Sequence, residues 1–215
     1  MHDGNSSIKA REFQVQDLAK SDVDLVAEAQ QRFSMELLQA LMTKLYKRNP
    51  GEWRRFGHKH VEAAVGRVFG PGRTGIYPEL EGKRSINAIC LVFDEAYAGD
   101  RVLAFVEGLR SMIVASYNGK QQIFLTDELD PQKLYNAARN IEIAVWKLNT
   151  NRDSAGSLFL VGNETAGPVK NLSFERLFGK LIALQDSTAR IVAEKSNRRI
   201  KNVIQSVASA VFLPI

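Results

Sequence analysis

The sequence has few of the residues that usually bind metals or form disulfides. Among its 215 residues there is one cysteine, Cys90, and there are three histidines, two of which are His58 and His60. One cysteine excludes a disulfide framework and any multi-cysteine zinc or iron–sulfur site. On a helix, His58 and His60 would lie about 200° apart and could not bind the same ion. The sequence therefore predicts no metal and no cofactor.

The single cysteine lies in the apolar run Ala-Ile-Cys-Leu-Val-Phe, residues 88–93. In such surroundings a thiol packs as a small hydrophobic group, and its thiolate form is disfavoured. We therefore expect Cys90 to be structural and unreactive in the native protein.

Long apolar runs are also missing. No stretch reaches the about 18–20 consecutive apolar residues that a membrane-spanning helix needs, and residues 1–13 lack the apolar core of a signal peptide. These absences predict no membrane span and a cytoplasmic location. A trimmed secreted protein or bacterial lipoprotein would look the same, with the small polar residues 3–7 as a tether. A periplasmic, envelope-associated protein is therefore the alternative.

The motifs of common enzyme classes are incomplete. Residues 70–75 match the letters G-x-G-x-x-G, but a predicted helix precedes them, Pro71 removes an amide and no helix follows. Asp94 and Glu95 follow an apolar run as in P-loop ATPases, yet no phosphate-binding G-x-x-x-x-G-K-[ST] loop exists. No G-x-S-x-G elbow is present either. The sequence predicts no catalytic residue, and an enzyme is the least favoured class.

Helical periodicity, by contrast, extends over most of the chain. Hydrophobic residues make up 45% and charged residues 25%, as in ordinary soluble globular proteins. Apolar residues recur at steps of three and four. This predicts a mostly α fold: a single-domain helical bundle of five or six helices, with at most a small two-stranded β element and a long C-terminal helix. Residues 1–20 are expected to form a loosely ordered arm, and residues 21–215 the single helical domain.

The segment 21–69 is expected to form an antiparallel pair of helices. Ser21 is a good N-cap for the first helix, which ends at Asn49-Pro50-Gly51. The apolar stripe of this helix comprises Val26, Phe33, Leu37, Leu41 and Leu45. The second helix is expected to run from about Glu52 to Phe69. Its inward side would comprise Trp53, Phe56, His60, Ala64 and Val68. The Gly- and Pro-rich stretch 70–84 then forms a loop before residues 85–215.

Two segments in the second half fit more than one structure. Residues 86–93 fit either a helix or a buried strand. Residues 112–125 fit a helix that stops at Asn118-Gly119 and is followed by a short strand at 121–125, which we prefer, or a hairpin that turns at the same dipeptide. A second short strand is expected at 157–161, as a partner for residues 123–125.

The clearest helix runs from Asp130 to Asn149, because Asp130 is a good N-cap and Pro131 takes the first helical position. Its buried side is expected to comprise Leu134, Ala138, Ile141, Val145 and Leu148. A long C-terminal helix is expected to begin at Ser173 and to continue to about Val207.

Positive charge is concentrated in two segments. Residues 42–73 contain eight basic and two acidic residues, and residues 174–211 contain seven and three, in a chain of net charge +5. The remainder is therefore acidic. Cations at helix ends complement the helix dipole and charged faces solvate helices, which is one explanation. An anionic partner is the other.

The segment 44–73 interleaves its cations with Tyr46, Trp53 and Phe56, the combination that nucleic-acid-binding proteins use for phosphates and bases. The candidate residues for an anionic partner are Arg54, Arg55, His58, Lys59 and Arg73. We expect Asp17, Asp22 and Asp24 to neutralise these cations within the molecule.

Together these observations predict a non-enzymatic interaction or scaffold protein. Its partner is expected to be another protein or a second copy of itself, which would make it a homo-oligomer. A nucleic-acid-binding module that uses residues 44–73 is the main alternative.

Overall fold

The computed structural model describes residues 20–124, 126–164, 171–196 and 211–215. Within these ranges the chain forms seven α-helices, one short 3₁₀ helix and no strand. The elements are α1 (Asp22–Arg48), α2 (Pro50–Arg55), α3 (Val61–Phe69), the 3₁₀ helix η2 (Pro78–Leu80), α4 (Ser85–Leu91), α5 (Arg101–Ser116), α6 (Pro131–Thr150) and α7 (Ser173–Ser196).

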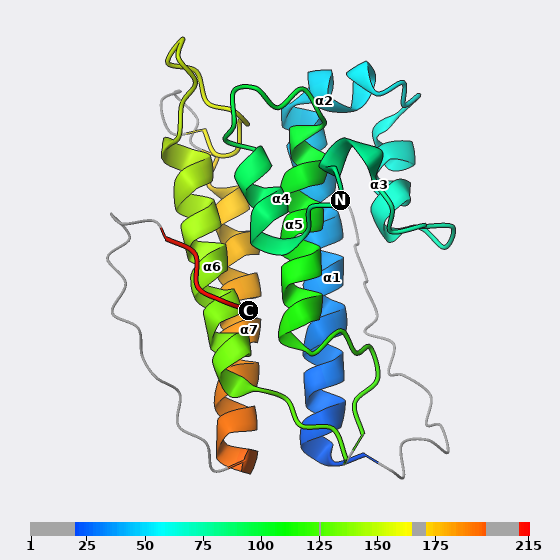
Figure 1. Ribbon diagram of the computed structural model, residues 1–215, viewed down its shortest axis with the longest axis vertical. Coiled ribbons are helices and arrows are strands. Elements are labelled where there is room, and N and C mark those ends of the chain that lie inside the picture. Colours follow the sequence, from blue (N-terminus) through cyan, green and yellow to red (C-terminus); the bar gives the residue numbers. More distant parts are fainter. Residues whose placement is uncertain (1–19, 125, 165–170, 197–210) are drawn as a thin grey trace, which may run out of the picture.

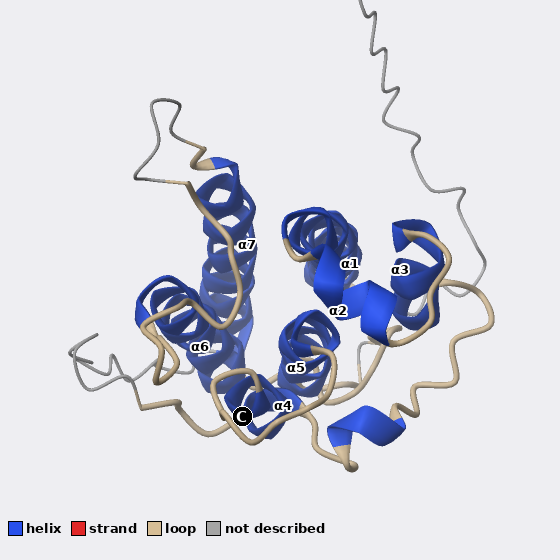
Figure 2. Cartoon of the chain, turned by 90° about the horizontal axis from the view of Figure 1, so that it is seen from above, coloured by secondary structure: helices blue, strands red, loops and turns tan. Residues whose placement is uncertain are grey.

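The four long helices α1, α5, α6 and α7 form a bundle in which each helix packs against two others (Figure 1). Helices α1 and α7 are antiparallel, because Lys44 Nζ lies 2.5 Å from Ser173 Oγ and Lys195 Nζ lies 2.6 Å from Asp24 Oδ1. The short helices α2 and α3 pack against α1, and α4 packs against α5 (Figure 2). The helical bundle predicted from the sequence is confirmed.

Apolar side chains from all four long helices build the core. Its largest fully buried side chains include Tyr46, Phe105 and Phe178, and the last two rings meet edge to face with centroids 6.2 Å apart. The predicted inward side of α6 is confirmed, because the five residues expected there are all buried: Leu134, Ala138, Ile141, Val145 and Leu148.

The predicted helix ends are confirmed where capping residues signalled them. The Ser21 hydroxyl accepts a hydrogen bond from Asp24 N (3.3 Å), and Asp130 Oδ1 accepts one from Gln132 N (2.9 Å). After α5, Gly119 has a φ of 74° and its N–H donates to Val114 O (2.9 Å). These contacts satisfy amides and carbonyls that a helix end leaves unpaired.

The continuous helix expected from Glu52 to Phe69 is wrong. The chain leaves the helical conformation after α2, and Gly57 has a φ of 74°. A new helix begins when His60 Nδ1 accepts a hydrogen bond from Ala63 N (3.2 Å) as the N-cap of α3. His60 is therefore exposed rather than inward, while Ala64 and Val68 are buried as expected.

Neither of the two expected short strands is present among the described residues, which omit residue 125. Ile123 N donates to the buried Glu28 Oε1 of α1 (2.7 Å) instead of to a neighbouring strand. Residues 157–161 contribute only one isolated bridge, between Leu158 and Arg152. Side chains of α1 therefore bind backbone groups that a β ladder would otherwise have paired.

The two ambiguous segments, 86–93 and 112–125, are each helical in their first part only. Residues 86–91 belong to α4, and residues 112–116 complete α5. The buried position implied for Cys90 is wrong, because the residue lies on the exposed side of α4, whereas its low reactivity stays a prediction. The expectations for the arm at 1–19 and for a helix beyond Ser196 to Val207 fall on residues outside the described ranges.

Candidate functional site

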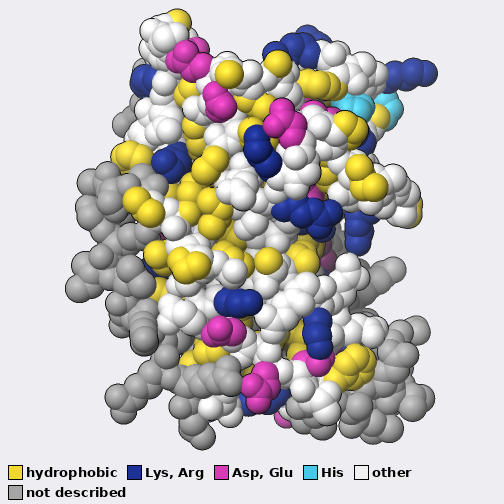
Figure 3. Space-filling view, in the orientation of Figure 1, with side chains coloured by type: hydrophobic (Ala, Val, Ile, Leu, Met, Phe, Trp, Pro, Cys, Tyr) yellow, Lys and Arg dark blue, Asp and Glu magenta, His cyan; other side chains and the backbone are white. Residues whose placement is uncertain are grey.

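The residues predicted to bind an anionic partner are not all in one place. Arg54 and Arg55 end α2, and Lys59 lies in the connection to α3, and all three are exposed. Lys and Arg side chains are visible at the upper right of Figure 3, the end of the molecule where Figure 1 shows α2. Arg73 follows the other end of α3, where it lines a separate hollow with Arg32 and Arg110. Because the nine residues of α3 span about 13 Å, the structure separates Arg73 from the rest.

Part of the positive charge at this end is already neutralised. Arg55 pairs with Glu52 (2.8 Å), and the guanidinium of Arg54 lies 5.1 Å from the centroid of the Trp53 ring. Partial burial and the neighbouring Arg67 lower the pKa of His58. A lowered pKa leaves the imidazole neutral at pH 7, so His58 adds no positive charge.

The prediction that acidic residues near the N-terminus neutralise the basic residues at the end of α2 is wrong for Asp22 and Asp24, the two that the structure describes. Asp22 and Asp24 begin α1, whereas the basic end follows Arg48, the last of its 27 residues, which is about 40 Å away. Asp24 instead pairs with Lys195 (2.6 Å). Although burial raises the pKa of Asp24, hydrogen bonds from Lys195 and Ser21 outweigh it, so the net direction is downward. Asp17 lies outside the described residues.

An apolar groove lies between α1 and α7, with a volume of about 500 Å³. Phe33 and Leu37 of α1 and Leu184 of α7 contribute its apolar lining. Glu36 and Lys180 add one charge of each sign. The groove therefore combines an apolar surface with a charge on each of its two helices.

The groove is present because only some of the apolar side chains predicted to form one buried stripe on α1 are in the core. Leu41 and Leu45 are in the core, but Val26 and Phe33 are 40% and 47% exposed. Polar residues such as Glu28 and Gln31 take the buried positions instead, because the segment before α6 supplies Ile123 N and Lys120 O as their partners. The prediction that Val26 and Phe33 belong to the core is thus wrong, because both side chains are exposed.

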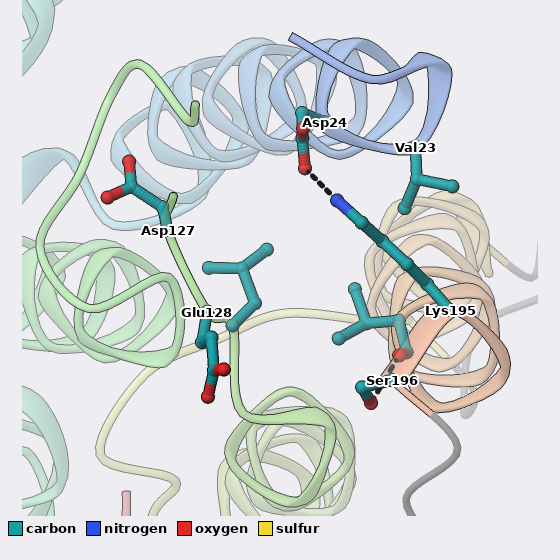
Figure 4. Close-up of a pocket in the computed structure, with 8 residues that line it drawn as sticks. Val23, Asp24, Asp127, Glu128, Lys195 and Ser196 are labelled. Atoms are coloured by element: carbon teal, nitrogen blue, oxygen red, sulfur yellow. Dashed lines mark hydrogen bonds and ion pairs between the residues drawn. The ribbon is translucent and has the colours of Figure 1, made fainter. Parts of the chain in front are cut away.

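A second hollow, of about 260 Å³, lies where α1 begins and α7 ends (Figure 4). Lys195 reaches across it to Asp24, and Asp127, which also lines it, pairs with Lys120. The hydroxyl of Ser196 donates to Val192 O (2.7 Å). Because these groups already bind one another, the arrangement supplies neither an activated nucleophile nor an open ligand set.

Among the residues that the structure describes, no three histidine, cysteine or acidic side chains come together in a way that could hold a metal ion. Over the same residues, no helix combines the length and the apolar character needed to cross a bilayer. Comparison with protein-family models, curated proteins and solved structures finds no match to this chain.

Proposed function

We propose that this chain is a non-enzymatic interaction protein that associates with a second copy of itself through the groove between α1 and α7. The observation that carries the proposal is the exposure of Phe33, at 47%, beside Leu37 and Leu184. A phenylalanine ring exposed next to further apolar residues gains free energy when a partner covers it.

The charges of the groove favour a second copy as the partner. Glu36 lies on α1 and Lys180 on α7, and both line the groove. A twofold axis parallel to the helices would place α1 of one copy against α7 of the other. Glu36 of each copy would then face Lys180 of the other, which gives two symmetric ion pairs around an apolar centre.

The surface formed by α1 and α7 is also large enough for a stable dimer interface. The 24 residues of α7 span about 36 Å, and two adjacent helices are about 20 Å wide. The face therefore offers about 700 Å² per copy, close to the about 800 Å² per partner of a stable interface. A dimer of this kind needs no rearrangement of the bundle.

The proposal is tested by sedimentation velocity over a wide concentration range. We expect a concentration-dependent dimer in the wild type, and at least about tenfold weaker association in Phe33→Glu, because a charge would be buried in the interface. Ile76→Glu is the matched control, since Ile76 is 74% exposed and lies outside the groove. At concentrations where the wild type is monomeric, both variants are expected to keep its thermal stability.

Charge reversal tests the pairing itself. Glu36→Lys and Lys180→Glu should each weaken the dimer, and the double variant should restore it, because the two pairs are then reversed together. A wild type that stays monomeric at every concentration would contradict the proposal. So would a dimer that Phe33→Glu and Ile76→Glu affect equally.

A further inference from the structure

Residues 211–215 lie along α6 and are bound there by two asparagine side chains (red segment in Figure 1). Asn140 Nδ2 donates to Leu213 O (2.8 Å), and Leu213 N donates to Asn140 Oδ1 (2.6 Å). Asn136 Nδ2 donates to Pro214 O (2.8 Å). One side-chain amide thus pairs with both backbone groups of Leu213, as a neighbouring β-strand would.

The two asparagines are well placed for this contact. They are four residues apart on α6, so they lie one above the other on the same helix face. Asn140 is 0% and Asn136 is 6% exposed, and Gln132 Nε2 fixes the second amide by donating to Asn136 Oδ1 (2.9 Å). Buried amides without partners destabilise a fold. The backbone of residues 211–215 satisfies them.

The side chains of the bound segment add apolar contacts. Phe212 and Ile215 pack against the core, and Lys147 Nζ lies 5.8 Å from the centroid of the Phe212 ring. None of the five residues 211–215 is buried, and Val211 is 62% exposed. The segment is therefore bound through its backbone and two or three apolar side chains, a set of contacts that another segment can reproduce.

We propose that this face of α6 is a peptide-binding site for an extended apolar segment of a partner protein, and that residues 211–215 are its built-in, displaceable occupant. The bound segment defines the chemistry of the ligand: an extended backbone with free N–H and C=O groups at the position of Leu213, apolar side chains on both sides and a proline directly after it. Asn140 and Asn136 form hydrogen bonds with the backbone of the bound segment. The apolar side chains of the segment provide the selectivity for its sequence. The site is separate from the groove between α1 and α7, so either proposal can fail without the other.

The test uses the full chain with the double substitution Phe212→Asp and Ile215→Asp, which weakens the built-in occupant. A fluorescein-labelled peptide with the sequence of residues 211–215 is titrated with this variant and followed by fluorescence anisotropy. We expect saturable binding to the variant. Binding to the wild type should be about tenfold weaker or more, because its own segment competes at a high effective concentration.

Two further measurements identify the contact. A peptide N-methylated at the position of Leu213 keeps every side chain but lacks the N–H that Asn140 accepts, so its binding should be lost. In the protein, Asn140→Leu added to the double variant should abolish binding. Asn149→Leu, at an exposed asparagine of the same helix, should leave it unchanged.

Failure of the peptide to bind the double variant would overturn the proposal. Equal binding of the N-methylated and unmodified peptides would also overturn it, because the backbone would then not be read. This second result requires no substitution in α6, so it stands even if Asn140→Leu disturbs the helix.

Discussion

Gly108 of α5 and Ile89 of α4 approach each other so closely that only glycine fits at this position. A Cβ atom at residue 108 would lie 2.6 Å from Ile89 Cγ1 and 2.9 Å from both Ile89 N and Ser85 O. Real Cβ atoms do not approach other heavy atoms this closely. The close packing of α4 against α5 therefore requires a residue without a side chain at position 108.

Gly108→Ala is expected to destabilise the protein by about 1–3 kcal/mol, because the added methyl group forces α4 away from α5. Gly179→Ala is the matched control: Gly179 also lies within a helix, but nothing lies within 4 Å of its Cβ position. There, alanine should stabilise by up to about 1 kcal/mol through helix propensity. Urea unfolding measures both, and equal stability of the two variants would contradict the close contact.

Asp100 gives the fold a pH dependence. Its side chain is buried, where it accepts hydrogen bonds from Leu103 N (2.9 Å) and from the Tyr46 hydroxyl (2.7 Å). Burial raises the pKa of Asp100 to about 6, from an ordinary value of 3.8, although these hydrogen bonds act in the opposite direction. The native protein therefore binds this proton more tightly than the unfolded chain does.

Such a group stabilises the native state fully below pH 3.8, and its contribution is lost as the pH rises through about 6. In Asp100→Asn the side chain cannot ionise and still accepts from Leu103 N. Between about pH 4 and pH 7, the wild type should lose about 1–3 kcal/mol relative to this variant. Urea unfolding at a series of pH values measures the difference, and a difference independent of pH would contradict the prediction.

The parts of the fold that sequence predicts well are those fixed by local chemistry. Helix α6 has an N-cap at Asp130, a proline at its first position and a regular apolar side, and all three features are present in the structure. The sequence does not reveal the break after α2, because a single glycine, Gly57, is tolerated within many helices. Only the capping bond of His60 to Ala63 N shows that a new helix begins there.

The candidate site is harder to predict, because it depends on contacts between distant segments. Periodicity groups Phe33 with Leu41, but Phe33 is exposed, and the polar residues Glu28 and Gln31 are buried against residues 120–123 instead. Asn136 and Asn140 look like ordinary polar residues until residues 211–215 lie against them. A four-residue spacing of two asparagines beside apolar positions was the one available signal.

The reactivity of Cys90 can be measured directly, because the sequence predicts an unreactive thiol whereas the residue is exposed in the structure. The thiol is on the exposed side of α4, so the native protein should react with a thiol reagent stoichiometrically and without unfolding. Partial burial raises the pKa of Cys90, opposed by Lys147, so the rate should keep rising above about pH 8.5. Cys90→Ser should not react. Labelling that occurs only after denaturation would show that Cys90 is buried after all.

The basic residues at the end of α2 lead to the last prediction. Arg54, Arg55 and Lys59 are exposed, but Arg55 pairs with Glu52 and Arg73 lies elsewhere. Binding to a nucleic acid is driven largely by the counterions that protein cations release from its phosphates, and this surface offers few such cations. We therefore expect no micromolar binding to generic DNA or RNA, even at about 50 mM salt.

Fluorescence anisotropy with labelled DNA and RNA measures this, and the triple variant Arg54→Glu, Arg55→Glu, Lys59→Glu is its control. These substitutions are exposed, so each should change stability by no more than about 0.5 kcal/mol. Tight binding that falls steeply between about 50 and 200 mM salt and disappears in the triple variant would establish a nucleic-acid-binding module instead. Binding that persists in the triple variant would place the contact on another surface, and the hollow that Arg73 shares with Arg32 and Arg110 would then be the next to substitute.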